Sequence, residues 1–304
     1  MFEHLLVPLD GSRLAEAALP AAATLARRLG SRVTLVHIVE PDAPQEIHGE
    51  RHLSDPAEAG AYLHEVAAHA FSPGVPVKTH MHDAGEGVAP SIVASAGELE
   101  AGLVVMCTHG EGGLRTWLLG SIAQQVVALG TTPVLLVQPD GAAATPAFAC
   151  RRLLVPLDGQ AGHEQGLAVA AELARACPAE LHLLLVVPTL ATLPGELGTA
   201  ARLLPAATRN WLDLWEEDAW AHLHQEATGL QASGLHAAAE VCRGDPAAGI
   251  ARAAESARAD LIVMGTHGKS GMEAFWSGSV AAQVARHSRV PLLLVPVREV
   301  GSDS

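Results

Sequence analysis

A glycine-rich loop late in the chain has residue types that could bind a phosphate. The segment Gly265–Ser279, GTHGKSGMEAFWSGS, directly follows the apolar run Leu261–Met264. Glycines lack Cβ, so backbone N–H groups can approach phosphate oxygens closely, and Lys269 adds a positive charge. The segment is not a P-loop, because that motif would need a glycine where Val263 stands. The loop is therefore a candidate anion site of another kind.

The end of this loop strengthens that interpretation. Gly278 and Ser279 precede a helical pattern, and the free N–H groups and dipole of a helix N-terminus favour an anion. The Ser279 hydroxyl can donate a further hydrogen bond. The plain alternative is a flexible connection followed by an ordinary serine cap. A single loop of this kind would favour the plain alternative.

The loop is not single, because the chain contains the same unit twice. The segment Cys107–Ser121, CTHGEGGLRTWLLGS, has nearly the same spacing. The heptapeptide LLVPLDG begins at Leu5 and again at Leu153, 148 residues later, and the closing PVLLV of Pro133–Val137 returns as PLLLV 158 residues later. The second copy thus has about ten extra residues, expected near Trp211–Thr228. The repeat predicts two domains, 1–140 and 150–300, joined by an Ala-, Pro- and Gly-rich linker.

Each copy also places an aspartate at the end of its first apolar run. Asp10 and Asp158 both precede a glycine. Such a carboxylate can accept hydrogen bonds from ribose or adenine, or help to hold a metal. An Asx turn or helix N-cap is the structural alternative. The recurrence of aspartate with glycine loop in both copies favours the ligand-binding interpretation.

Short apolar runs alternate with longer helical patterns in both copies, which predicts βαβ crossovers and a parallel sheet covered on both faces. We expect an α/β protein of two tandem doubly wound domains, each with a five-stranded parallel sheet. Ligands bind at the carboxyl ends of the strands in such folds. The predicted strands are Leu5–Leu9, Val33–Val39, Val77–Met81, Leu103–Cys107, Val134–Val137, Leu153–Leu157, Leu181–Val187, His236–Cys242, Leu261–Gly265 and Leu292–Val295. The predicted helices of the first copy are Arg13–Leu29, Ala57–Ala70, Val88–Glu98 and Ser121–Leu129.

Composition limits the classes of partner. The chain of 304 residues has a formal net charge of −14, which disfavours extended binding to nucleic acid or to an anionic membrane. The four cysteines include no C-x-x-C pair, so neither a zinc site nor a disulfide framework is predicted. No apolar run is long enough to span a bilayer, and the N-terminus does not read as a signal peptide. The expectation is a cytoplasmic protein.

These motifs together resemble the universal stress protein family, and the whole chain resembles a tandem member of its ATP-binding type. The nucleotide-binding branch of that family carries G-x-x-G, nine residues, then G-[ST]. The resemblance implies a Rossmann-like, adenine nucleotide α-hydrolase-like fold in each half, with the halves packed as an internal pseudo-dimer through their closing strands. The second half matches the motif at every position, with Gly265, Gly268, Gly278 and Ser279.

The resemblance also implies the roles of individual residues. Asp158 and the backbone at Val186 would contact adenosine, while the glycine loop with Lys269 and Ser279 would bind phosphates, accompanied by Mg²⁺ or Mn²⁺. In the first half, Cys107 replaces the first motif glycine and Glu111 stands in the place of Lys269. The second half is therefore the better candidate for nucleotide binding. The first-half counterparts are Asp10, Ile38, Gly110, Gly120 and Ser121.

The leading interpretation is a regulatory protein that binds ATP, or AMP or ADP, mainly in its second half, and presents a surface to an unknown protein partner. A homodimer is a further expectation. Two alternatives stay open: a nucleotide-free interaction protein, and a slow ATPase or phosphoryl-transfer enzyme. No catalytic residue is predicted, since no nucleophile or general base can be argued beyond the aspartate.

Three tryptophans and three histidine pairs complete the candidates. Trp211 and Trp215 stand at i, i+4 spacing, with Trp220 five residues further on, which predicts a buried stripe, with a partner-binding face as the alternative. The histidine pairs supply two ligands each and predict no metal site. They are His48 with His52, His80 with His82, and His222 with His224.

Overall fold

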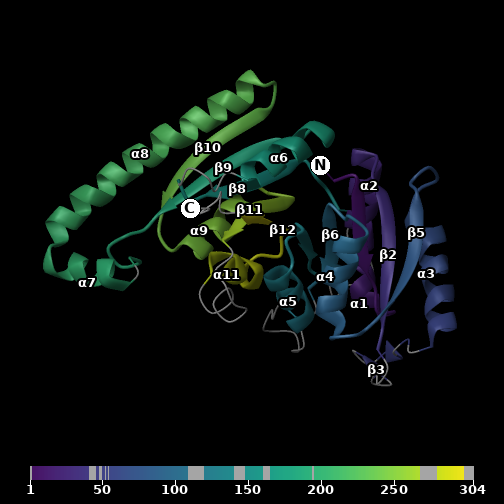
Figure 1. The fold of residues 1–304 in the computed structure, drawn as a ribbon. Helices are drawn as coiled ribbons and strands as arrows, with labels where there is room; N and C mark the ends of the chain where they lie inside the picture. Colours follow the sequence, from purple (N-terminus) through teal and green to yellow (C-terminus); the bar gives the residue numbers. More distant parts are fainter. Residues whose placement is uncertain are drawn as a thin grey trace, which may run out of the picture. The chain divides into compact units, whose positions relative to one another are not determined.

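A computed structural model describes residues 2–40, 46–47, 50–51, 53, 55–108, 120–139, 148–159, 165–193, 195–267 and 279–297. They form two compact α/β units (Figure 1). The first unit contains the described residues between positions 2 and 149, together with Ser279 and Pro291–Pro296. The second contains Cys150–His267, Val280–Val290 and Val297–Ser304.

The first unit is built on strands in the order β12-β7-β6-β1-β2-β5. Neighbours from β7 to β5 are parallel, and β12 runs antiparallel to β7. The central strands β1 and β6 are apolar on both faces, as expected for strands covered on each side. The strands are β1 (His4–Pro8), β2 (Arg32–Val39), β5 (Val77–Asp83), β6 (Leu103–Cys107), β7 (Val134–Val137) and β12 (Leu292–Val297).

Helices of the first unit fall into two contacting sets. Helix α2 (Leu19–Leu29) packs on β1 and β2 and contacts α3 (Pro56–Ala70). Helix α4 (Val88–Glu98) packs on β2 and β5 and contacts α5 (Ser121–Leu129). Right-handed crossovers place these sets on opposite faces of the sheet.

The first predicted helix is wrong in one respect, because Arg13–Leu29 is not continuous. The structure has a short α1 (Arg13–Glu16) and then α2, which carries Pro20 in its first turn. Proline has no N–H, and its ring would collide with the carbonyl one turn earlier in a continuous helix. The chain therefore restarts the helix, with the proline where no hydrogen bond is needed.

The second unit repeats the arrangement, with strand order β10-β9-β8-β11, all parallel. Several strands run one or two residues beyond their predicted ends. The strands are β8 (Arg152–Leu157), β9 (Glu180–Val187), β10 (His236–Arg243) and β11 (Leu261–His267). The helices are α6 (Gln165–Ala176), α7 (Gly195–Leu203), α8 (Pro205–Ala232), α9 (Pro246–Ser256) and α11 (Val280–His287).

Helix α8 contains the region expected to hold the extra residues of the second copy, Trp211–Thr228. It has 28 residues, whereas α3, which connects the corresponding strands of the first unit, has 15. Figure 1 shows it running beside β10, which it contacts. Within the described part of the chain, neither α8 nor any other helix combines the length and apolar character needed to cross a membrane.

The closing strands of the two copies are hydrogen-bonded to each other, as predicted. β12 pairs antiparallel with β7, with Leu292 opposite Leu136 and Leu294 opposite Val134. A short two-stranded sheet, β3 (Glu46–Ile47) with β4 (Glu50–Arg51), has no counterpart in the sequence-based expectation. The wider expectation of an internal pseudo-dimer stays a prediction.

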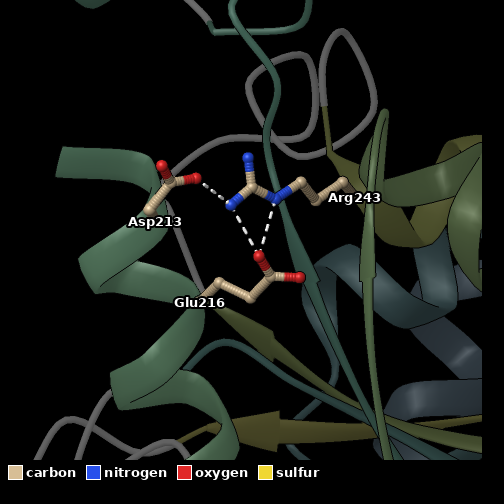
Figure 2. Close-up of polar contacts among 3 residues, drawn as sticks. All are labelled: Asp213, Glu216 and Arg243. Carbon is tan, nitrogen blue, oxygen red and sulfur yellow. Dashed lines mark hydrogen bonds and ion pairs between the residues drawn. The ribbon is translucent and has the colours of Figure 1, made fainter. Parts of the chain in front are cut away.

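An arginine at the end of β10 links that strand to α8 (Figure 2). The Arg243 Nη2 atom donates to Asp213 Oδ1 at 2.5 Å and to Glu216 Oε2 at 2.6 Å, and Nε donates to Glu216 Oε2 at 2.8 Å. The hydrogen bonds that Arg243 donates to Glu216 and then to Asp213 raise its pKa, so the cation is favoured further. The link holds the first half of α8 against the carboxyl end of the sheet.

We expect Arg243→Ala to lower the free energy of unfolding by about 1 kcal/mol, because the cluster is solvent-accessible and screened. Urea melts at low and high NaCl would measure it. The loss should shrink at high salt, and Arg175→Ala, an arginine at the end of α6, serves as the control. A loss independent of salt would mean that Arg243 acts through packing alone.

Candidate functional site

Three predicted site positions of the second unit lie together at one edge of its sheet. The parallel register pairs Leu157 with Leu185, so the next residues, Asp158 and Val186, are level with each other. The register of β11 with β8 pairs Leu261 with Leu153 and Ile262 with Leu154; continued for three more residues, it would put Gly265 level with Leu157. The carboxylate, the β9 backbone and the first loop glycine therefore meet at the carboxyl end of the strands.

Gly265 is in direct contact with a helix that sequence reasoning did not single out. A Cβ placed on Gly166, in the first turn of α6, would lie 3.0 Å from the Gly265 nitrogen and 3.4 Å from the Met264 carbonyl carbon. Only a residue without a side chain lets α6 approach the end of β11 this closely. Two glycines thus face each other at the base of the candidate loop.

Val186, on β9, is tightly packed against helix α9. A Cβ on Gly249 of α9 would lie 3.0 Å and 3.1 Å from the two methyl groups of Val186, and 3.4 Å from Cys242 Sγ. Val186 and Cys242 are paired across β9 and β10. The backbone position implied for adenosine is therefore held from the α9 face.

The remaining residues of this site are only partly described. Ser279 is half-buried and directly precedes α11, which is the usual position of a helix N-cap residue. Gly268, Lys269 and Gly278 lie outside the described residues.

In the first unit, the Asp10 side chain forms an Asx turn. Its Oδ1 accepts from the Ser12 N–H at 2.9 Å, and the Ser12 hydroxyl then accepts from the Ala15 N–H, which caps α1. Gly11 between them has a φ of +92°, in the region that favours glycine. The Asx turn weighed as the plain alternative is present here, and it uses one carboxylate oxygen.

A leucine covers this turn in the first unit. A Cβ on Gly11 would lie 2.7 Å from Leu53 Cδ1, whereas a Cβ on Gly159, its second-unit counterpart, would lie 3.3 Å from Leu185 Cδ1. The ring nitrogens of buried His37 lie 2.8 Å from the Leu9 carbonyl oxygen and 2.9 Å from that of Leu53. His37 thereby ties Leu53 to the end of β1. Leu185, at the matching position of β9, cannot make such a link.

The corresponding positions of the two units differ consistently in burial. Ile38 is 6% exposed and Cys107 2%, whereas Val186 and Gly265 are half-buried. Asp10 is half-buried, whereas Asp158 is exposed. Burial, followed by the nearby charge of Asp10, raises the pKa of the Cys107 thiol, which keeps it protonated. The strand edge is therefore more open in the second unit.

The first-unit loop residues are partly described as well. Gly120 is the N-cap of α5 without a side-chain hydrogen bond, and Ser121 is the first, exposed residue of that helix. Gly110 lies outside the described residues, as does Glu111.

The described parts of the chain contain no group of three His, Cys, Asp or Glu residues arranged to hold a metal ion. The rings of His80 and His82 lie 6.0 Å apart on β5, and His222 and His224 lie on α8. His48 and His52 lie outside the described residues.

Comparison with known proteins connects this geometry to a family. The model of the universal stress protein family matches residues 1–138 and again residues 149–296. The chain belongs to the universal stress protein family. It contains two universal stress protein domains in tandem.

Relatives with one and with two domains are both found. A universal stress protein of Synechocystis is 36% identical over 139 residues, 45% of this chain and 86% of its own length. One from Mycobacterium tuberculosis is 25% identical and covers 95% of both chains. A crystal structure of an Archaeoglobus fulgidus universal stress protein matches with a TM-score of 0.67 at 17% identity, over 99% of this chain and 97% of its own. A putative universal stress protein of Pseudomonas aeruginosa matches with a TM-score of 0.65 at 18% identity, over 97% of this chain and 93% of its own.

Sequence reasoning missed Gly166 and Leu53. Gly166 carried a usable signal, because a glycine inside a predicted helix costs stability and usually marks a close approach. Its first-copy counterpart, 148 residues earlier, is Ala18. Leu53 carried no signal, since it lies outside every predicted helix and strand.

The two strand-end glycines offer a matched test of this geometry. Gly159→Ala should lower the free energy of unfolding by about 1 to 2 kcal/mol, because φ is +73°. Gly11→Ala should cost about 1 kcal/mol more, because the new methyl group meets Leu53. Denaturant melts measure both. In a Leu53→Ala background, Gly11→Ala should cost no more than Gly159→Ala. If Gly11→Ala instead costs as much there as in the wild type, Leu53 does not cover Gly11.

The buried thiol predicts a pH effect. The unfolded thiol loses its proton near its ordinary value of 9.0, whereas the folded pKa of Cys107 is raised. Above that pH the unfolded state binds fewer protons, so stability falls by about 1.4 kcal/mol per pH unit for this group. The free energy of unfolding, measured from pH 8 to 10, should fall less steeply in Cys107→Ala than in the wild type. Parallel curves would contradict the assignment.

Proposed function

We propose that this universal stress protein binds an adenine nucleotide, ATP or its products ADP and AMP, at the open strand edge of its second domain. The observation that carries the proposal is the difference between the two edges. Asp158, Val186 and Gly265 meet at the carboxyl end of β8, β9 and β11 with half-buried or exposed surface, whereas their counterparts in the first domain are more buried. The complete G-x-x-G-x₉-G-S motif belongs to the same domain.

Each position has a physical role in this proposal. The Asp158 carboxylate accepts hydrogen bonds from ribose hydroxyls, and the β9 backbone at Val186 offers donor and acceptor groups to the adenine edge. Gly265 lies in β11, two residues before its end, and has no Cβ to hinder its amide. The sequence motif assigns the Ser279 hydroxyl to the phosphates, as the residue directly before α11.

The contact between Gly166 and Gly265 supports the same assignment. A side chain at either position would push α6 away from β11. The first domain has Ala18 and Cys107 at these positions, 0% and 2% exposed. The opposed glycines are therefore a property of the domain that also has the complete motif.

The phosphates of ATP would bring Mg²⁺ or Mn²⁺, which bind mainly to phosphate oxygens and water and need few protein ligands. Lys269 would place a further positive charge beside the phosphates. The proposal includes no hydrolytic step, because none of the described groups at the edge stands out as a base for attack by water.

A regulatory role follows from nucleotide binding to a loop. A ligand that binds one arrangement of the loop more tightly shifts the population toward it, and a partner protein can read the change. This stress-response role is part of the proposal.

Isothermal titration with Mg-ATP tests the site. Wild type should bind close to one nucleotide per chain. Asp158→Ala should weaken binding at least tenfold, which corresponds to about 1.4 kcal/mol for lost hydrogen bonds to ribose. Gly265→Cys, which copies the first domain, should weaken it at least as much, because the thiol crowds the loop.

Matched substitutions in the first domain are the controls. Asp10→Ala and Cys107→Gly should leave the affinity of the second site unchanged, provided that circular dichroism shows folded protein. Equal affinity for Asp158→Ala, Gly265→Cys and wild type would overturn the assignment. Loss of binding on Asp10→Ala alone would move the site to the first domain.

A further inference from the structure

Exposed apolar side chains concentrate on one part of the second domain. Among the described residues, eight large hydrophobic side chains are exposed, and six of them fall between positions 197 and 220. The six belong to α7, α8 or the residue between them: Leu197 (51% exposed), Leu203 (77%), Leu204 (64%), Trp211 (43%), Leu214 (60%) and Trp220 (42%). A concentration of exposed apolar side chains on neighbouring elements marks an interaction site more often than scattered single residues do.

The prediction that the tryptophans form a buried stripe is therefore wrong for Trp211. Helix α8 buries a different set, Leu212, Ala219, Leu223 and Ala227, and it packs on β10 and β9. The ring of Trp215 lies 5.1 Å from that of Trp211 and is half-buried, so it bridges the two faces.

The exposed side of α8 has a regular repeat of its own. Its residues are spaced by three and four positions, which is the a/d pattern of helices that pack against another helix. They are all exposed, and we call them the outer stripe: Leu204, Ala207, Trp211, Leu214, Asp218 and Ala221. Helix α3 of the first domain has no such stripe, since its large apolar residues Leu63 and Val66 are buried.

Charge along the outer stripe is unevenly distributed. Helix α8 starts at Pro205 without a side-chain cap and without an acidic residue in its first turn. Three turns later, Glu217 and Asp218 are exposed on the same side. An uncapped helix N-terminus favours a negative charge, and this helix does not supply one locally.

We propose that the outer stripe of α8 is the contact surface between two copies of this chain, with the two α8 helices antiparallel. An antiparallel alignment centred between Trp211 and Leu214 places each of these residues against the other one in the second copy. It also sets Leu204 against Ala221. In this alignment the second copy covers the apolar ends of the stripe, Leu204 and Ala221, and also its two large central side chains.

The same alignment satisfies the charge pattern. Asp218 of one copy meets Ala207 of the other, in the first turn of the uncapped helix, with Glu217 beside it. A parallel pair would instead place Asp218 against Asp218 and Glu217 near Glu217, and like charges repel. Charge complementarity therefore selects a second copy in antiparallel orientation. This contact does not depend on nucleotide binding.

Light scattering of the full chain after size exclusion tests the contact. Wild type should have twice the monomer mass, and the double variant Trp211→Glu, Leu214→Glu should be a monomer. The control is Leu129→Glu at the end of α5, an equally exposed leucine, which should stay dimeric. A monomeric wild type, or a dimeric double variant, would overturn the proposal. If the double variant fails to fold, Trp211→Ala with Leu214→Ala, which adds no charge, takes its place.

Disulfide trapping tests the orientation. Ala207→Cys with Asp218→Cys in one chain should give a covalent dimer on oxidation, because the antiparallel alignment brings the two positions together. Within one helix they are 11 residues, or about 16 Å, apart and cannot bridge. Each single variant should stay uncrosslinked. Efficient crosslinking of Ala207→Cys alone would show a parallel pair and contradict the proposal.

Discussion

The parallel hydrogen-bond register at the centre of each domain is the constraint on which the rest of the structure depends. Because β8, β9 and β11 run in one direction, the segments that follow them leave from the same edge. That edge collects Asp158, the backbone at Val186 and Gly265 from positions up to 107 residues apart. A slip of one residue in this register would turn each of these side chains to the other face of the sheet.

The two domains of this universal stress protein show how the same scaffold can carry two different edges. In the first domain, Asp10 closes an Asx turn, Leu53 covers Gly11, and Cys107 is buried. In the second, opposed glycines and a half-buried Val186 leave the edge more open. The strand edges can differ in this way because both domains have the apolar strands and helices that form the fold.

The second domain also differs on its outside. Its long helix α8 is attached to the sheet by Arg243 and by a buried apolar face, and it presents a second apolar face to solvent. Two faces on one helix allow a contact with another molecule without disturbing the packing that supports the strand edge. A nucleotide function and an assembly function can therefore be separate properties of the same domain.

Much of this protein was readable from the sequence alone. The repeat, the order of strands and helices, and the strand-end positions of Asp158 and Gly265 follow from apolar periodicity and glycine spacing, because these are local properties of the chain. The break at Pro20 is also local, and we missed it only because the surrounding pattern is strongly helical. The tertiary structure decided the rest. The approach of Gly166 to Gly265, the leucine over Gly11, and the exposure of Trp211 all depend on which distant surface meets which, and no spacing along the chain records that.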